Sequence, residues 1–307
     1  MADRDRRPRP FLDADRAEVA EYRERMKSRA KGTHTLAKLP RLRVPSRKGA
    51  RTHLVIGDSH AHCDEGNQRF ESLGRMAREL KPDVIVDIGD SADVSCLLGF
   101  ESGSKAPIFE GFKYWRDIDV YRDAKERFHH YLGKSSARLV RIIGNHENRI
   151  DRVLEVEPRF RGVIGLEDLG DADFGWQVVP FVEPIEVDRV VYCHYFKAQG
   201  SQRAVGGVMP ARAVVLKYPG SFTRVFGHTH AFGYFEDADG TPGQSGRKIT
   251  SINAGNYFDV EMSGMRWSGT DRNKWRSGIL LLEVDDGQVL SWQWFDFWEI
   301  QRRWGKP

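Results

Sequence analysis

The sequence lacks the features that place a chain in a membrane or in an oxidising compartment. Among its 307 residues there are only three cysteines, Cys63, Cys96 and Cys193, whose unrelated spacings exclude a disulfide framework and a zinc cage built of thiolates. No run of about 18 apolar residues occurs, so no segment is expected to span a membrane. The first ten residues are charged and have no apolar stretch of the secretory kind. We therefore expect a cytoplasmic protein.

The chain also has little net charge, but that charge is unevenly distributed. Residues 1–50 hold 15 Lys and Arg against 7 Asp and Glu, whereas residues 51–307 hold 33 against 37. A basic segment of this kind is typical of nucleic-acid contacts, and a solvated or disordered tail explains the composition equally well. We expect a basic extension over 1–50, partly helical over 13–30 or disordered, followed by one folded domain over 51–307.

From residue 51 onward, short apolar strands alternate with amphipathic helices, which predicts an α/β fold. Apolar residues at helical spacing predict helices over 67–80 and 117–132, and the segment 278–295 reads as a β-hairpin that turns at Asp285, Asp286 and Gly287. Further strands are expected over 53–56, 84–88, 139–143, 190–193 and 223–226. Residues 95–116 have no clear period and are expected to be irregular.

Each of these five strands is followed by residues able to bind a metal. The motifs contain Asp58 and His60, then Gly89 and Asp90, then Gly144, Asn145, His146 and Glu147, then His194, and finally Gly227, His228 and His230. Any one motif alone is common, and a lone histidine such as His194 is more often a buried core residue. Ligand sites in α/β sheets lie at the carboxyl ends of strands, so the five together predict a single site.

The residue types in the motifs suit two divalent cations. Two such ions held about 3.5–4 Å apart need a bridging anion, and Asp90 is the candidate. Asp58 and His60 are two residues apart on an extended segment, so their side chains point the same way. Carboxylate, amide and imidazole ligands without thiolate favour Mn, with Fe or Zn as alternatives.

The order of the motifs resembles that of the calcineurin-like metallophosphoesterases, whose pattern is D-x-H, G-D-x-x-D, G-N-H-[DE], H and G-H-x-H. The resemblance covers roughly residues 53–260 and implies a four-layer α/β/β/α sandwich of two mixed sheets. It implies that Asp58, His60, Asp90 and His230 bind one metal and that Asp90, Asn145, His194 and His228 bind the other. His146 matches the catalytic histidine of the family, and Asp93 matches the carboxylate that orients it.

The resemblance implies hydrolysis of a phosphoester by a metal-bridging hydroxide, with His146 as general acid. The substrate is expected to be a phosphomonoester or a phosphodiester, and a nuclease that uses the basic arm is the alternative. A Ser/Thr protein phosphatase is disfavoured because Val94 stands where those enzymes have arginine, and because they lack the last motif. A scaffold that has lost catalysis is disfavoured because all the expected ligands and His146 are present. The compact chain is most similar to single-domain members found in bacteria and their phages.

Several neighbouring residues allow more than one interpretation. Glu147 is expected either to support the site or to cap a helix, and Arg149 and Arg152 either to contact substrate phosphate or to face solvent. The stretch 197–222, with Arg203 and Arg212, is either a lid over the substrate or an ordinary surface segment. Residues 253–256 resemble a loop that supports the site in the family, His62 is near enough to line it, and Cys63 and Cys193 are expected to be packing residues.

Overall fold

The computed structural model describes residues 49–63, 65–98, 113–198, 200–201, 203–218, 223–238, 248–261 and 274–305. The expected helix over 13–30 and nearly all of the basic extension lie outside these described residues. Most of the irregular stretch 95–116 lies outside them as well.

The strands form two sheets, and the first sheet contains the first strand of the described chain and its last two strands. Its order is β11-β10-β1-β2-β3-β4, in which β1 to β4 run parallel while β10 and β11 run antiparallel to their neighbours. The strands of this sheet are β1 (Arg51–Ile56), β2 (Val84–Asp87), β3 (Arg138–Ile142), β4 (Gln177–Val179), β10 (Gly278–Asp285) and β11 (Gln288–Asp296).

The second sheet has the order β5-β6-β7-β9-β8, with β6, β7 and β9 parallel and both edge strands antiparallel. It consists of β5 (Ile185–Val187), β6 (Val190–Tyr192), β7 (Thr223–Phe226), β8 (Phe232–Ala238) and β9 (Lys248–Ala254). The expected α/β class is therefore confirmed, with two mixed sheets.

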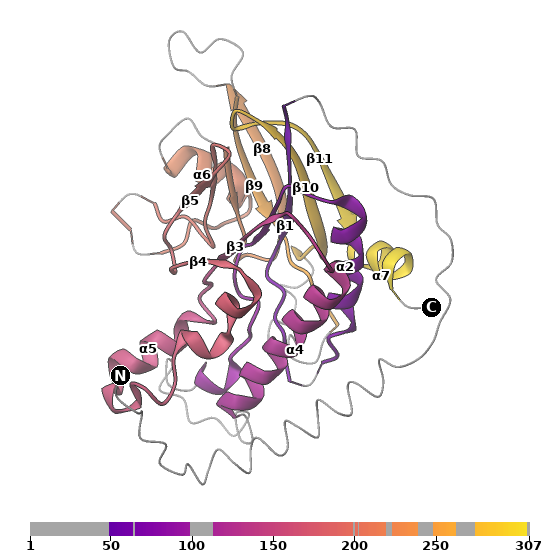
Figure 1. Cartoon of the computed structure of the whole chain (residues 1–307). Helices are drawn as coiled ribbons and strands as arrows, with labels where there is room; N and C mark the ends of the chain where they lie inside the picture. The colour runs from indigo at the N-terminus through magenta and orange to yellow at the C-terminus, as the bar shows by residue number, and fades with distance from the viewer. Residues whose placement is uncertain are drawn as a thin grey trace.

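Alternation along the strands builds the layers. In β10, Ile279 and Leu281 pack in one buried cluster with the helices, whereas Leu280 and Leu282 pack in another cluster that contains strands of both sheets. Helices α2 (Gln68–Leu80), α4 (Tyr114–Leu132) and α7 (Phe297–Trp304) lie on one side, and α6 (Pro210–Lys217) lies on the other (Figure 1). This arrangement is compatible with the expected four-layer sandwich.

Most elements expected from the sequence are present with small changes at their ends. The predicted hairpin is formed, and its two-residue turn has φ of 47° at Asp286 and 76° at Gly287. Positive φ at both positions matches the twist of the flanking strands. The sequence analysis did not anticipate β4, β5, β8, β9, α7 or the short helix α5 (Asn148–Val156) that follows β3.

The parallel strands determine where the motifs lie. Strands β1, β2 and β3 end just before Asp58, Asp90 and Asn145, and β6 and β7 of the other sheet end just before His194 and His228. Carboxyl ends of parallel neighbours meet at one edge of a sheet, so the fold delivers the motifs of each sheet to a shared edge.

Candidate metal centre

Three overlapping groups of side chains have ligand atoms close enough to hold a metal ion. In each group the ligand atoms all lie within 4.8 Å of one another. The groups are Asp58, His60 and His230; His60, Asp90 and His146; and Asp90, His194 and His228. His60 and Asp90 each belong to two groups, so the three form one continuous centre.

The first group joins the two sheets. His230 Nε2 lies 3.1 Å from Asp58 Oδ2 and also 3.1 Å from His60 Nε2. Asp58 and His60 follow β1 of the first sheet, whereas His230 follows β7 of the second. All three side chains are nearly or completely buried.

The group of Asp90, His194 and His228 also crosses between the sheets. His194 Nε2 lies 2.9 Å from Asn145 Oδ1 and 3.4 Å from Asp90 Oδ2, and His228 Nδ1 lies 2.8 Å from the same Asn145 oxygen. Asn145 Oδ1 therefore lies close to both histidines, and its role as a ligand stays a prediction. All seven predicted ligand residues are thus gathered in one place.

The hydrogen bonds of His194 indicate that this geometry fits a cation. Its Nδ1 lies 3.1 Å from the carbonyl oxygen of Ile88, which can only accept, so Nδ1 carries the proton. The lone pair of Nε2 then faces the oxygens of Asn145 and Asp90. Such facing acceptors repel one another unless a proton or a metal ion lies between them, which is how metal-binding histidines are oriented.

His60 has the same arrangement. Its Nδ1 lies 3.0 Å from Asp93 Oδ1, so Nδ1–H donates a hydrogen bond to the carboxylate and Nε2 lies toward His230. The outer partner thereby fixes the tautomer that presents a lone pair to the centre. Nitrogen and oxygen donors presented in this way fit a divalent cation in each outer group.

Electrostatics in the centre follow from burial opposed by close charges. Burial would raise the pKa of the Asp90 carboxyl, but the His194 and His146 rings outweigh it and hold that pKa well below its usual value. Burial likewise opposes protonation of His194, and the Asp90 charge overcomes it and raises the pKa of His194 to about 9. Cation binding at such a centre is expected to release protons from imidazole.

His146 lies beside the ligands and is held from two sides. Its Nδ1 is 2.9 Å from Asp93 Oδ1, and its Nε2 is 3.9 Å from Asp90 Oδ2. Burial works against the charged ring, but Asp90 and Asp93 together raise the pKa of His146 above its ordinary value. The imidazole is therefore biased toward the protonated form that a proton donor requires.

Arg149 contacts His146 directly. Its Nη1 and Nη2 lie 3.0 and 3.2 Å from the two ring nitrogens of His146, and Nη1 donates to the Asp93 carbonyl oxygen at 2.8 Å. Because Arg149 is only 6% exposed, its expected alternative as a solvated surface residue is wrong. Arg152, Arg203 and Arg212 are exposed.

Four candidate ligands adopt a backbone conformation that is uncommon for non-glycine residues. The φ angles are 41° at His60, 51° at Asp90, 69° at His228 and 58° at His230. A left-handed backbone conformation at a non-glycine residue costs free energy. It therefore persists only where the surrounding structure fixes the backbone. Here they turn the side chains inward directly after the strands end.

The glycines of the motifs are required by close approach. A Cβ atom on Gly227 would lie 2.2 Å from Asp58 Oδ1, and one on Gly144 would lie 2.2 Å from Asp90 Oδ1. Both distances are far below van der Waals contact. Any side chain at these positions would therefore displace a candidate ligand carboxylate.

Glu147 is completely buried next to the candidate metal centre. It is the N-cap residue of α5, but its side chain makes no capping hydrogen bond to that helix. It accepts a hydrogen bond from Arg141 Nη2 at 2.7 Å and, at 2.7–3.1 Å, from the backbone amides of Asp90, Ser91, Ala92 and Gly144. One carboxylate therefore holds together the loops after β2 and β3.

A buried charge network beneath these loops was missed in the sequence analysis. Arg141 contacts Asp87, Glu147 and Asp171, and Lys125 lies 2.7 Å from the second oxygen of Asp87. The sequence feature that could have indicated this network is a charged residue inside each of two apolar strands. A charge buried in a sheet needs a partner of opposite charge. Asp87 and Arg141 are in fact paired in register across β2 and β3.

The remaining predicted positions divide between support and other roles. Asn256 donates to the His230 carbonyl oxygen at 3.1 Å and pairs with Asp58 through backbone, so the loop over 253–256 does support the centre. His62 Nε2 lies 3.8 Å from Asp93 Oδ2. Cys63 and Cys193 are buried among apolar side chains, as expected.

The described part of 197–222 includes α6, which packs on the second sheet, and the lid role stays a prediction.

No model of a known protein family matches the chain, and no curated protein matches it. None of the helices within the described ranges combines the length and apolar character that crossing a bilayer would require. The function must therefore be inferred from the chemistry of the centre itself.

Proposed function

We propose that this protein is a two-metal phosphoesterase of the calcineurin-like kind. The observation that supports it most strongly is the convergence of candidate ligands from five strand ends. Six of the seven lie, with His146, in linked groups that share His60 and Asp90, and Asn145 lies beside His194 and His228. Oxygen and imidazole donors without thiolate are typical of catalytic rather than structural metal sites. Mn is the expected ion, with Fe or Zn as alternatives.

The residues would divide between two cations. Asp58, His60, Asp90 and His230 would hold the first, and Asp90, Asn145, His194 and His228 would hold the second. When bound, the two ions would supply positive charge for the phosphoryl oxygens and would acidify a water molecule into a nucleophile.

His146 is proposed to protonate the oxygen that leaves phosphorus. Asp93 lies 2.9 Å from Nδ1 of the ring and raises the pKa of His146, which favours the protonated form that a general acid requires. Asp93 and Arg149 contact the ring and hold it in one orientation. Arg149 is thus proposed as a positioning residue, in place of the phosphate contact considered from sequence.

The decisive test is hydrolysis of p-nitrophenyl phosphate and bis-p-nitrophenyl phosphate with Mn²⁺ supplied and then chelated, together with elemental analysis of the protein. We expect about two metal ions per chain and turnover that disappears on chelation and returns with Mn²⁺. Comparison of the two substrates separates monoesterase from diesterase activity. A chain that takes up no transition ion, or that turns over equally well after chelation, would refute the proposal.

A further inference from the structure

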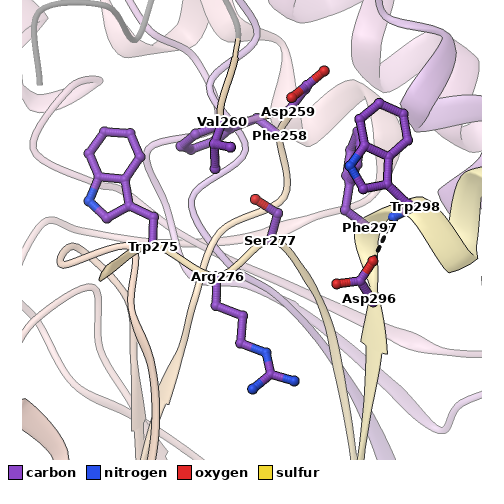
Figure 2. Close-up of a pocket in the computed structure, with 9 residues that line it drawn as sticks. All are labelled: Phe258, Asp259, Val260, Trp275, Arg276, Ser277, Asp296, Phe297 and Trp298. Atoms are coloured by element: carbon purple, nitrogen blue, oxygen red, sulfur yellow. Dashed lines mark hydrogen bonds between the residues drawn. The ribbon is translucent and has the colours of Figure 1, made fainter. Parts of the chain in front are cut away.

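A pocket of about 200 Å³ opens beside the candidate metal centre. Three segments form its walls: residues 258–260 after β9, residues 275–277 before β10, and residues 296–298 where β11 passes into α7 (Figure 2). Phe258 and Phe297 are buried, whereas Trp298 is 63% exposed at the rim. The pocket therefore has a buried base and opens to solvent at its rim.

The pocket shares a wall with the metal centre. The ring of Trp275 lies 4.5 Å from the ring of His230, and the ring of Phe258 lies 5.4 Å from those of His60 and His230. Trp275 and Phe258 also contact each other at 5.6 Å. A group attached to phosphorus at the centre could thus extend past Trp275 into the pocket.

The pocket combines aromatic rings with two carboxylates. Asp259 uses Oδ1 to accept a hydrogen bond from the Glu261 amide, and Asp296 uses Oδ1 to accept one from the Trp298 amide. The second oxygen of each accepts no hydrogen bond from the residues that the structure describes. Negative charge at the rim and aromatic rings in the walls together favour a cation.

Arg276, the basic residue among the described residues that line the pocket, does not cancel this charge. The Arg276 side chain extends away from Asp259 and Asp296 in Figure 2. Its guanidinium carbon lies 5.6 Å from the rings of Phe232 and Trp294, on the aromatic side chains of β8 and β11. The side chains that face the pocket therefore carry net negative charge.

We propose that the pocket binds a quaternary ammonium group on the alcohol portion of the substrate, so that the protein prefers phosphoesters of choline-type amino alcohols. This inference rests on the proposed phosphoesterase function, because the centre must hold the phosphoryl group while the pocket holds the ammonium. Trp275 lines the pocket on the side of the metal centre and Trp298 lines it at the rim, while Asp259 and Asp296 supply the counter-charge.

The test compares phosphocholine with 3,3-dimethylbutyl phosphate, which has the same shape but carbon in place of the charged nitrogen. If the enzyme turns over only diesters, the methyl diesters of both replace them. We expect kcat/KM for the charged ester to exceed that for the neutral ester by at least about tenfold, the scale of one desolvated cation–π contact.

The matched variant is the double substitution Asp259→Asn with Asp296→Asn, in which Asn at 296 retains the cap of α7. The ratio of the two kcat/KM values should fall toward one. Asp285→Asn, an exposed carboxylate at the far end of β10, should keep the wild-type ratio. A wild-type ratio near one, or a ratio unchanged in the double variant, would overturn the proposal.

Calorimetric titration with choline chloride separates this inference from the proposed function, because binding needs no turnover. Choline should bind wild-type protein and bind at least about fivefold more weakly to the double variant. If neither ester is hydrolysed with Mn²⁺ but choline binds, the phosphoesterase function fails and the pocket assignment stands. If the esters are hydrolysed and choline does not bind, the pocket assignment fails alone.

Discussion

At the scale of single residues, hydrogen bonds orient two of the candidate ligand histidines. Hydrogen bonds on the outer side of His60 and His194 fix which ring nitrogen faces inward. Asp90 belongs to the middle group and to one outer group, and the surrounding imidazoles lower its pKa in spite of burial. Ligands oriented in advance in this way bind metal without a large rearrangement of side chains.

Replacing His146 with Ala should lower turnover without removing metal. We expect kcat to fall on the order of 10²–10⁴-fold, because a positioned general acid contributes about that much to a rate. Steady-state assays with p-nitrophenyl esters and elemental analysis of the same preparation check both parts. His130→Ala, an exposed histidine on α4, is the control. Undiminished turnover in the His146 variant would contradict the role as proton donor.

Replacing Glu147 with Gln should destabilise the fold. The change places an NH₂ group among backbone donors and leaves the buried Arg141 short of a counter-charge. Loss of one partner from a buried pair typically costs about 3–5 kcal/mol. Urea unfolding measures the loss, and Glu155→Gln, an exposed residue of the same helix, should stay within about 0.5 kcal/mol of the wild type. Equal stabilities of the two variants would argue against this role for Glu147.

The sequence made the ligands predictable but not the residues that support them. Asp58, Asn145 and His228 each follow an apolar strand, so their chemistry and position are both visible in the chain. The partnership of Glu147 with Arg141 depends on which strands are neighbours and on their register. That information arises only when the sheet forms.

At the scale of elements, the junction between α4 and the segment before β4 has a pH-sensitive contact. Trp176 donates through Nε1 to His129 Nε2 at 2.8 Å, so the bond requires a neutral imidazole. Burial, with a smaller contribution from the Lys125 charge, lowers the pKa of His129 to about 4. This junction is therefore expected to weaken in acid.

The sign of the effect follows from proton uptake. The unfolded chain binds a proton at His129 near pH 6.5, whereas the folded protein does so only near pH 4, so stability is lost as pH falls between these values. The contribution reaches up to about 3 kcal/mol. In His129→Gln, which still offers an acceptor to Trp176, urea unfolding should depend less on pH in this interval. His130→Gln should follow the wild type, and a His129→Gln curve identical to the wild type would contradict the assignment.

Elements with a strong pattern were predictable, and those defined by their neighbours were not. The helix over Tyr114–Leu132 and the hairpin at Asp286 and Gly287 carry local signals that are sufficient on their own. Strand β8 is half exposed and β4 is three residues long, so neither has a clear period. Helix α7 begins with the Asp296 cap directly after β11, and its apolar residues continued the strand pattern in the sequence.

At the scale of the whole molecule, the candidate ligands connect the two sheets. Each outer metal group combines one carboxylate that follows a strand of the first sheet with one or two histidines that follow strands of the second. The strands that precede these ligands belong to both sheets. A bound cation would therefore act as a cross-link between the halves of the sandwich, in addition to its chemical role.

Metal binding should consequently stabilise the whole fold. A ligand present at 100 times its Kd adds about 2.7 kcal/mol to the free energy of unfolding. For a domain of this size, that corresponds to a rise in Tm of about 5–10 °C. Differential scanning calorimetry of chelated protein, before and after addition of Mn²⁺, measures the shift. His230→Ala, which removes the second-sheet ligand of one group, should reduce the rise, whereas His130→Ala should preserve it. A Tm that does not respond to Mn²⁺ in the wild type would show that no cation joins the two sheets.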